Sequence, residues 1–368
     1  MRTIKGFVFS KDRCFEPGSV TFDSGVIVSV ETFPKQELSA EEQDTLILPG
    51  LVDIHMHGAV GIDVCSASEN ELRKLAEYEK SRGITSFFPT TMTLPSKRLE
   101  SICKTIADAS RKCEAIKGIN LEGPFVSHGR CGAQNAEYAV NPDTGLMLGL
   151  NDAGQGKIRF VTFAPELPGA ERFVTENAGK FVLSAGHSDA DYETASKAFA
   201  LGVKHVTHLY NAMTPFAHRN PGIPGAAFDN ENVEVELISD GEHVHPSVVR
   251  NTFKSFGADR IILISDSTAA TGEACGEYYL GGRKIINNGS VAKLLDGTIA
   301  GSVSTLYDCL VSAVKMGIPG EDAIVAATFN PARAAGIDSV CGSLEPGKNA
   351  DILVTDKRYV IREVYSKC

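Results

Sequence analysis

The sequence predicts an α/β protein whose main part is a (β/α)8 TIM-type barrel, joined to a small β-sandwich domain built from the N- and C-terminal segments. Three observations lead to this fold class. Eight apolar runs alternate with stretches of helical periodicity, both ends of the chain carry strand-like patterns, and polar residues gather where the apolar runs end. A chain of 368 residues with 43% hydrophobic residues has enough apolar material for such a core.

The two ends of the chain have the character of strands. Residues 1–50 contain "GFVFS", "SVTFDSGVIVSV" and "TLILPG", which combine β-branched residues with turn glycines and lack a helical period. The last segment, "GSLEPGKNADILVTDKRYVIREVYSKC", shows the same pattern. Both segments cannot extend a closed barrel, so we expect residues 1–50 and 338–368 to pair into the small β domain. Residues 51–337 then form the barrel.

Between these ends, strand and helix patterns alternate. The eight apolar runs are "LVDIHMH", "ITSFFPTT", "GINLEGP", "IRFVTFAPE", "FVLSAGHS", "VKHVTHLYNA", "VEVELISDG" and "RIILISDS". Helical candidates separate most of them, for example residues 69–83 and 190–202, and each of these two ends in a glycine suited to a helix C-cap. Parallel strands connected by crossover helices favour the barrel.

Composition excludes several classes of function. The formal charge of −10, without a basic cluster, argues against nucleic-acid binding. No apolar stretch approaches the roughly 20 residues that span a bilayer, and the N-terminal apolar run is too short for a secretory signal. Nine cysteines without a C-x-x-C pair fit reduced thiols better than disulfides or a thiolate zinc site. We therefore expect a cytoplasmic enzyme.

Polar residues at the ends of the apolar runs predict a metal site. Side chains alternate along a strand, so His55 and His57 point to the same side and can share one cation. The carboxyl ends of barrel strands meet around one cavity, where unpaired polar groups would be costly. Imidazole and carboxylate ligands suit Zn²⁺ or Fe²⁺. The candidate ligands are His55, His57, Glu122, His187, His208 and Asp266, and Asp240 and His243 follow run seven.

Each candidate also has a structural alternative. A single histidine at a strand end is more often a satisfied structural residue than a ligand. Asp266 precedes "STAATG" and could cap a helix there. The six residues together favour the metal cavity over coincidence.

Longer motifs resemble a known family. "LPGLVDIHMHG" and "GSLEPGKNADILVTD" resemble the amidohydrolase superfamily. "LEGPF", "AGHSDA", "HLYNAMTPFAHRNPG", "SDGEHVHP" and "SDSTAATG" resemble the N-acetylglucosamine-6-phosphate deacetylase family within it. The resemblance covers almost the whole chain. It implies a cytoplasmic, metal-dependent hydrolase, usually a homodimer, that removes acetate from an amino-sugar phosphate.

The resemblance also implies roles for individual residues. Glu122, His187 and His208 correspond to metal ligands, and His55 with His57 to the pair found in members with two ions. Asp266 corresponds to the catalytic aspartate and is a further candidate ligand. One departure is Gln134, because many members carry a histidine there. The positions implied for substrate contact are Ala133, Gln134, Asn211, Ala212, Arg219, His243, Ile299, Ala300 and Gly301.

Two segments outside the strands have predicted roles. The stretch "TPFAHRNPGIPGAAF" is rich in glycine and proline and is predicted to lie outside the core. The resemblance makes it an arm that carries Arg219 to the phosphate site of a neighbouring subunit; the alternative is a solvated surface loop. The segment "CGEYYLGGRKIINNGSVAKLLDGTIAGS" predicts a β hairpin forming a lid or wall, or simple decoration.

Other functions remain open from the sequence. A dihydroorotase-like or dipeptidase-like amidohydrolase is one alternative, although run three offers Glu122 and no lysine that could bridge two metals. Deacetylation of N-acetylgalactosamine 6-phosphate is another, because the two sugars differ in one hydroxyl orientation. A non-catalytic protein on the same fold is disfavoured, since every expected ligand position is filled.

Overall fold

Every predicted barrel strand is present in the computed structural model, which describes residues 1–367. Each barrel strand is followed by an α-helix before the next barrel strand or the end of the barrel, as the predicted (β/α)8 topology requires. The short strands β6 (Gly58–Ala59) and β7 (Ile62–Asp63) lie between the first barrel strand and its helix. The barrel strands are β5 (Leu51–Met56), β8 (Ile84–Pro89), β9 (Ile119–Phe125), β10 (Ile158–Phe163), β11 (Val182–Ala185), β12 (His205–Val206), β13 (Glu234–Leu237) and β14 (Ile261–Leu263).

The strands follow one another in parallel around the barrel. One sheet runs in the order β14-β13-β12-β11-β10-β9, and β5 pairs with β8. Parallel bridges from Phe87 to Ile116 and from Thr90 to Asn120 connect β8 to the region of β9. The seam between the last and first strands is closed by backbone bonds from the Asp266 N–H to the His55 carbonyl, 3.0 Å, and from the His57 N–H to the Ser267 carbonyl, 2.8 Å.

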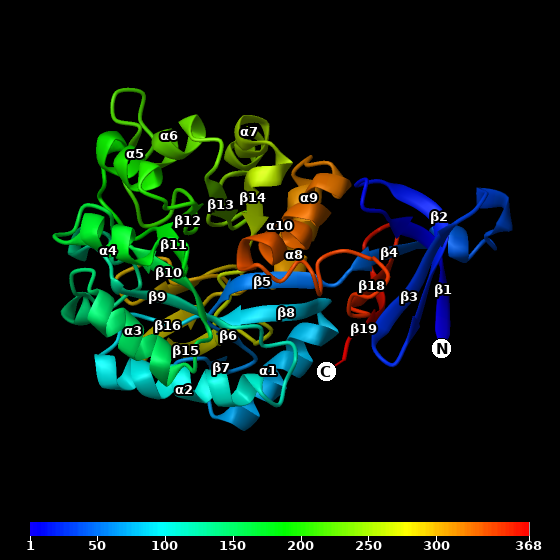
Figure 1. Cartoon of the computed structure of the whole chain (residues 1–368), viewed down its shortest axis with the longest axis horizontal. Helices are drawn as coiled ribbons and strands as arrows, with labels where there is room; N and C mark the ends of the chain where they lie inside the picture. Colours follow the sequence, from blue (N-terminus) through cyan, green and yellow to red (C-terminus); the bar gives the residue numbers. More distant parts are fainter. Residues whose placement is uncertain (368) are drawn as a thin grey trace.

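Helices surround the barrel (Figure 1). The first, α1 (Glu69–Ser81), begins with a capping box between Ser68 and Glu71, and Gly83 follows it with φ +82°. Its buried stripe packs on the strands, as the periodicity predicts. The other helices are α2 (Ser96–Ser110), α3 (Thr144–Ala153), α4 (Ala170–Asn177), α5 (Tyr192–Ala200), α6 (Gly222–Asp229), α7 (Pro246–Phe256), α8 (Leu306–Lys315), α9 (Gly320–Ala327) and α10 (Phe329–Ala335).

The small β domain joins both ends of the chain beside the barrel (Figure 1). Its sheet has the order β19-β18-β4-β1-β2-β3, so the C-terminal strands pair with the N-terminal ones. Buried Val8, Val20, Ile47 and Ile352 form its own apolar cluster. The strands are β1 (Arg2–Phe9), β2 (Phe15–Asp23), β3 (Val26–Thr32), β4 (Thr45–Pro49), β18 (Ile352–Asp356) and β19 (Ile361–Tyr365). The domain boundaries at residues 50 and 338 stay a prediction.

Two segments interrupt or decorate the barrel. The predicted hairpin is a three-stranded antiparallel sheet of β15 (Gly276–Leu280), β16 (Arg283–Asn287) and β17 (Ala292–Leu294). The prediction that the whole glycine- and proline-rich stretch lies outside the core was wrong. Residues 215–220 are exposed, but residues 222–227 are buried in α6, whose small apolar side chains pack closely against α5.

Every cysteine within residues 1–367 is a free thiol. None of the described helices is both long and apolar enough to cross a membrane.

Candidate metal centre and adjoining cavity

The six candidate ligands all lie at the carboxyl ends of barrel strands. His55 lies in β5 and His57 directly follows it, Glu122 lies in β9, and His187, His208 and Asp266 follow β11, β12 and β14. The backbone of the last three is left-handed, with φ of +47°, +29° and +47°. Non-glycine residues in this region are strained by about 1–3 kcal/mol each, and such strain clusters at functional sites. The fold therefore holds these side chains in place at an energetic cost.

Glu122, His187 and His208 form one group of potential ligands. Glu122 Oε1 lies 3.0 Å from Nε2 of His187 and 3.0 Å from Nε2 of His208. The two imidazole nitrogens are themselves only 3.1 Å apart. All three side chains are buried.

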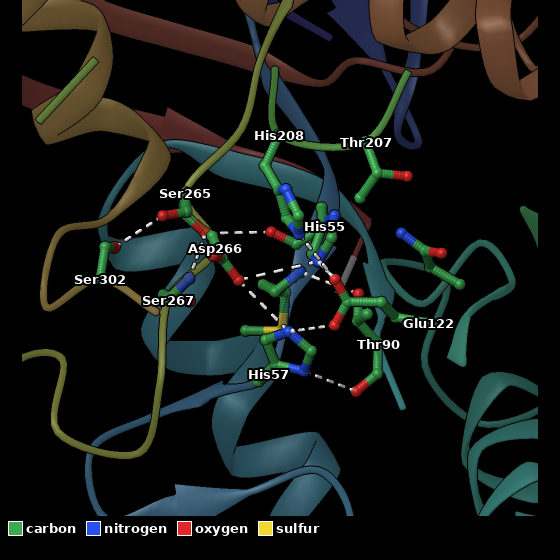
Figure 2. Close-up of polar contacts among 12 residues, drawn as sticks. His55, His57, Thr90, Glu122, Thr207, His208, Ser265, Asp266, Ser267 and Ser302 are labelled. Carbon is green, nitrogen blue, oxygen red and sulfur yellow. Dashed lines mark hydrogen bonds and ion pairs between the residues drawn. The ribbon is translucent and has the colours of Figure 1, made fainter. Parts of the chain in front are cut away.

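His55, His57 and Asp266 form a second group. Asp266 Oδ1 lies 3.2 Å from His57 Nε2 and 3.7 Å from His55 Nε2. Glu122 lies between the two groups, because its Oε2 is 3.2 Å from His57 Nε2 and its Oε1 is 3.4 Å from His55 Nε2. Figure 2 shows His55, His57, Glu122 and Asp266 pointing toward one another.

Three of the histidines are oriented through Nδ1, which leaves Nε2 toward the centre. His55 Nδ1 bonds to Glu236 Oε2 at 2.9 Å, His57 Nδ1 to the Thr90 carbonyl at 3.3 Å, and His187 Nδ1 to the Arg130 carbonyl at 2.9 Å. Each acceptor requires a proton on Nδ1. The lone pair of a neutral ring is then on Nε2, as a metal ligand requires.

The donor set fits a divalent cation. His55 Nε2 is buried and has no hydrogen-bond partner within the described chain. The Nε2 atoms of His187 and His208 point at each other and at one carboxylate oxygen. Hydrogens on both nitrogens would face each other, whereas one cation could bind all three atoms. Imidazole nitrogens and carboxylate oxygens together suit Zn²⁺ or Fe²⁺.

The pKa values show how strongly the centre favours positive charge. Burial opposes ionisation of Glu122, but the charges of His55 and His187 outweigh it and hold the pKa well below its usual range. Burial likewise opposes charge on His57, yet bonds to Asp266 and Glu122 raise its pKa to about 9. The pKa of Asp266 is lowered, because bonding to His57 and the histidine charges outweigh its burial. Asp266 is therefore a carboxylate at neutral pH.

The alternative role of Asp266 as a helix cap is wrong. Residues 267–275 contain turns and bends and no helix. The Asp266 side chain instead faces the two histidines of β5.

A cavity of about 290 Å³ opens beside the two groups, near the lower end of small-molecule sites. Its wall includes His57, Glu122, His187, His208 and Asp266 together with predicted substrate positions Ala133, Gln134, Asn211, Ala212, His243, Ile299 and Gly301. His55 is buried behind this wall, and Ala300 is fully buried beside it. Arg219 is exposed and is not part of the wall.

The predicted substrate residue Gln134 contacts the centre directly. Its Nε2 donates to Glu122 Oε2 at 2.5 Å, and its Oε1 accepts from the Thr93 N–H at 2.5 Å. The Thr93 bond fixes which end of the amide faces Glu122. Nε2 also approaches the Met92 sulfur at 3.5 Å, and both residues line the cavity.

Comparison with known proteins assigns the chain to a family. The amidohydrolase family profile matches residues 46–367. An N-acetylglucosamine-6-phosphate deacetylase of Bacillus subtilis is 34% identical, over 94% of this chain and 91% of the relative. The chain belongs to the amidohydrolase family. Its place there is with the N-acetylglucosamine-6-phosphate deacetylases.

Two further similarities bear on this amidohydrolase. An N-acetylgalactosamine-6-phosphate deacetylase of Escherichia coli O157:H7 is 32% identical over 93% of this chain and 91% of the relative. The structure of an aspartate-to-alanine mutant of the Mycobacterium smegmatis N-acetyl-D-glucosamine-6-phosphate deacetylase, in complex with N-acetyl-D-glucosamine-6-phosphate, superposes with a TM-score of 0.92. It is 31% identical and covers 99% of this chain and 97% of its own.

Sequence reasoning missed the partners that hold this amidohydrolase site. Glu236 supports His55 from inside β13. Asp240 was noted after run seven, but its bond to His243, with Oδ2 accepting from Nδ1 at 2.7 Å, was not foreseen. Arg283 of β16 donates from Nη1 to the carbonyls of Ala133, 3.1 Å, and Gln134, 3.0 Å. A carboxylate within an apolar strand was the available signal for Glu236, as it was for Glu122. Arg283 carried no comparable signal, because its partners lie about 150 residues away.

Proposed function

We propose that the protein hydrolyses N-acetyl-D-glucosamine 6-phosphate to D-glucosamine 6-phosphate and acetate. The observation that carries this proposal is the single cavity wall shared by both ligand groups and the predicted sugar-binding positions. Membership of the deacetylase family supports the same reaction. In it the amide C–N bond breaks, the acyl carbon gains the oxygen of water, and the nitrogen leaves as the sugar amine.

The protein uses one or two divalent ions, with Zn²⁺ or Fe²⁺ favoured. Glu122, His187 and His208 would hold one ion. His55, His57 and Asp266 would hold the other. When bound, such a cation polarises a carbonyl oxygen and makes nearby water acidic enough to attack at neutral pH.

Asp266 carries the proton in this scheme. Its carboxylate lines the cavity and its lowered pKa keeps it ionised, so it can accept a proton from the attacking water. It then returns this proton to the departing amine nitrogen. The second amide hydrogen of Gln134 faces the Met92 sulfur, a weak acceptor, and it can be donated instead to the acetyl oxygen as charge develops there.

The sugar phosphate lies on the side of Asn211, Ala212 and His243. Asp240 holds His243 Nδ1 and thereby orients the ring, which leaves Nε2 for a sugar hydroxyl or the phosphate. The Asn211 amide and the Ala212 backbone N–H add donors for phosphate oxygens.

Arg219 acts in trans within a homodimer and completes the phosphate site of the partner. It lies on the exposed loop of residues 215–220, and Phe216 on the same loop is 54% exposed. No ion pair of Arg219 is found within residues 1–367. An exposed aromatic beside an unpaired guanidinium supports contact with a second subunit, and a guanidinium binds phosphate bidentately.

A mixture of two inactive variants tests this arrangement. Arg219→Ala and Asp266→Asn are combined and allowed to exchange subunits. In a mixed dimer, the site on the Arg219→Ala chain has its own Asp266 and receives Arg219 from the Asp266→Asn partner. This one site of the dimer is therefore complete. With equal amounts and random exchange, about a quarter of wild-type specific activity should return. If activity does not recover although mass-tagged subunits demonstrate exchange, Arg219 does not act on the partner's site.

Deacetylation of N-acetyl-D-galactosamine 6-phosphate is the second candidate. The 32% identity to a deacetylase of that sugar supports it. The free thiols support a reducing, cytoplasmic location for either reaction.

Acetate release from the two N-acetylhexosamine 6-phosphates tests the proposal, with metal content measured on the same sample. The glucosamine derivative should have the higher kcat/KM. Unphosphorylated N-acetylglucosamine should be about 10- to 150-fold poorer, since losing one charged hydrogen bond costs roughly 1.5–3 kcal/mol. Preference for the galactosamine derivative would establish the second candidate, and release from neither sugar phosphate would refute both.

A further inference from the structure

Glu236 is a buried carboxylate behind the candidate metal centre, in strand β13. Only 1% of its surface is exposed, and it is not part of the cavity wall. A carboxylate in such a place is costly unless donors satisfy it. Glu236 has three: His55 Nδ1 to Oε2 at 2.9 Å, His205 Nε2 to Oε1 at 3.1 Å, and the His208 backbone N–H to Oε2 at 3.0 Å.

These bonds reach both ligand groups. Through Nδ1, Glu236 holds the ring of His55, which belongs to the group with His57 and Asp266. Through the backbone, it holds His208, which belongs to the group with Glu122 and has a strained φ of +29°. One side chain therefore spans the far side of both groups.

The Nδ1 hydrogen of His55 has a different kind of acceptor from the Nδ1 hydrogens of His57 and His187. His57 and His187 give their Nδ1 hydrogens to neutral carbonyls, at Thr90 and Arg130. His55 alone among these three gives it to a carboxylate. A charged acceptor fixes the tautomer more strongly and makes the opposite nitrogen a better electron-pair donor.

We propose that Glu236 is a positioning residue that keeps the His55 proton on Nδ1 and so presents an unprotonated Nε2 to a metal ion. It acts through His55 and does not touch substrate. The metal-binding consequence rests on the function proposed above. The orientation of the His55 proton does not, and it can be measured separately.

The first experiment replaces Glu236 by glutamine, which keeps the shape and one acceptor oxygen. In the place of Oε2, that oxygen can still accept from both the His208 N–H and His55 Nδ1, while the amide nitrogen faces His205. The variant therefore removes the negative charge and leaves His55 with a neutral acceptor, as His57 and His187 have. The matched control is Glu234→Gln, on the same strand, whose carboxylate pairs with Arg333 away from the cavity. Zinc binding is measured by equilibrium dialysis. Glu236→Gln should bind the weaker zinc equivalent about 10- to 100-fold less tightly, with the control unchanged.

The second measurement follows the proton itself by nitrogen-15 NMR, with the His55 signal assigned by its loss in His55→Gln. In the wild type, a hydrogen-bonded Nδ1–H signal is expected both without metal and with zinc, and Glu236→Gln should shift or remove it. A wild-type zinc-loaded protein with the His55 proton on Nε2 would overturn the proposal, even if Glu236→Gln failed to fold. An unchanged His55 signal in Glu236→Gln would do the same.

A double-mutant cycle separates action through His55 from general loosening. In the His55→Gln background, Glu236→Gln should have no further effect on zinc affinity. An equal loss in both backgrounds would show a structural role only. If the wild type binds no zinc at the His55 group, the two-ion part of the proposed function fails, while the proton signal still decides the role of Glu236.

Discussion

Replacing Arg283 by alanine tests whether the β15–β17 sheet takes part in catalysis. Arg283 Nη1 holds the carbonyls of Ala133 and Gln134, whose residues form part of the cavity wall. Gln134 in turn contacts Glu122. The guanidinium therefore ties the sheet to the loop that places the Gln134 amide beside the metal centre.

The expected magnitude follows from these contacts. A hydrogen bond from a charged group is worth roughly 1.5–3 kcal/mol, and one nitrogen here serves two carbonyls. Arg283 is only half-buried, so we take the lower end for the pair, about 1.5 kcal/mol. If the loop transmits this loss to the reacting centre, kcat/KM should fall about tenfold.

The assay is acetate release from N-acetylglucosamine 6-phosphate at several substrate concentrations, so that kcat and KM are separated. The control is Lys284→Ala on the same strand, because Lys284 pairs with Glu277 at 2.5 Å. No hydrogen bond or ion pair within residues 1–367 joins its side chain to the loop. The control should keep wild-type kinetics. Equal kcat/KM for both variants, within about twofold, would refute the idea that the tether matters.

Three further predictions concern the centre and its support. Asp266→Asn should lower kcat by about 10²–10⁴ with a smaller change in KM, and retained activity would remove its role as proton carrier. Replacing His55 by Gln and His57 by Asn together should reduce bound metal toward one ion per chain, as measured by elemental analysis; unchanged stoichiometry would contradict the second group. Burial raises the pKa of Asp53 to about 6 from 3.8. As pH rises, the Asp53 carboxyl group therefore ionises in the unfolded chain before it does so in the folded one. The folded state loses stability between these two pKa values. Urea unfolding should therefore show Asp53→Asn gaining about 3 kcal/mol relative to wild type between about pH 3 and pH 8, and parallel pH profiles would contradict this.

The sequence could predict the barrel and the gathering of the six candidate ligands because both depend on local pattern. A short apolar run that is rich in β-branched residues and bounded by turn residues favours a buried strand, and barrel closure brings the strand ends together. His55, His57, Glu122, His187, His208 and Asp266 were found in this way, and the structure gathers all six.

The remaining features depend on contacts between distant segments. Glu236 and His55 are 181 positions apart, and nothing near either residue indicates the pairing. The misjudged α6 has a different cause. Its glycines and prolines indicate a loop, but close packing against α5 favours small side chains, and this tertiary contact overrides the weak helix propensity.

The second ligand group lies at the seam of the barrel, so it forms only when the barrel has closed. Asp266 and His55 belong to the last and first barrel strands, and the Asp266 N–H bonds to the His55 carbonyl at that junction. An ion bound by His55, His57 and Asp266 would act as a clasp between segments more than 200 residues apart, and it would bind only after the final strand has docked. Free metal in the buffer should therefore stabilise the whole barrel against unfolding, by a free energy that rises with the logarithm of the metal concentration.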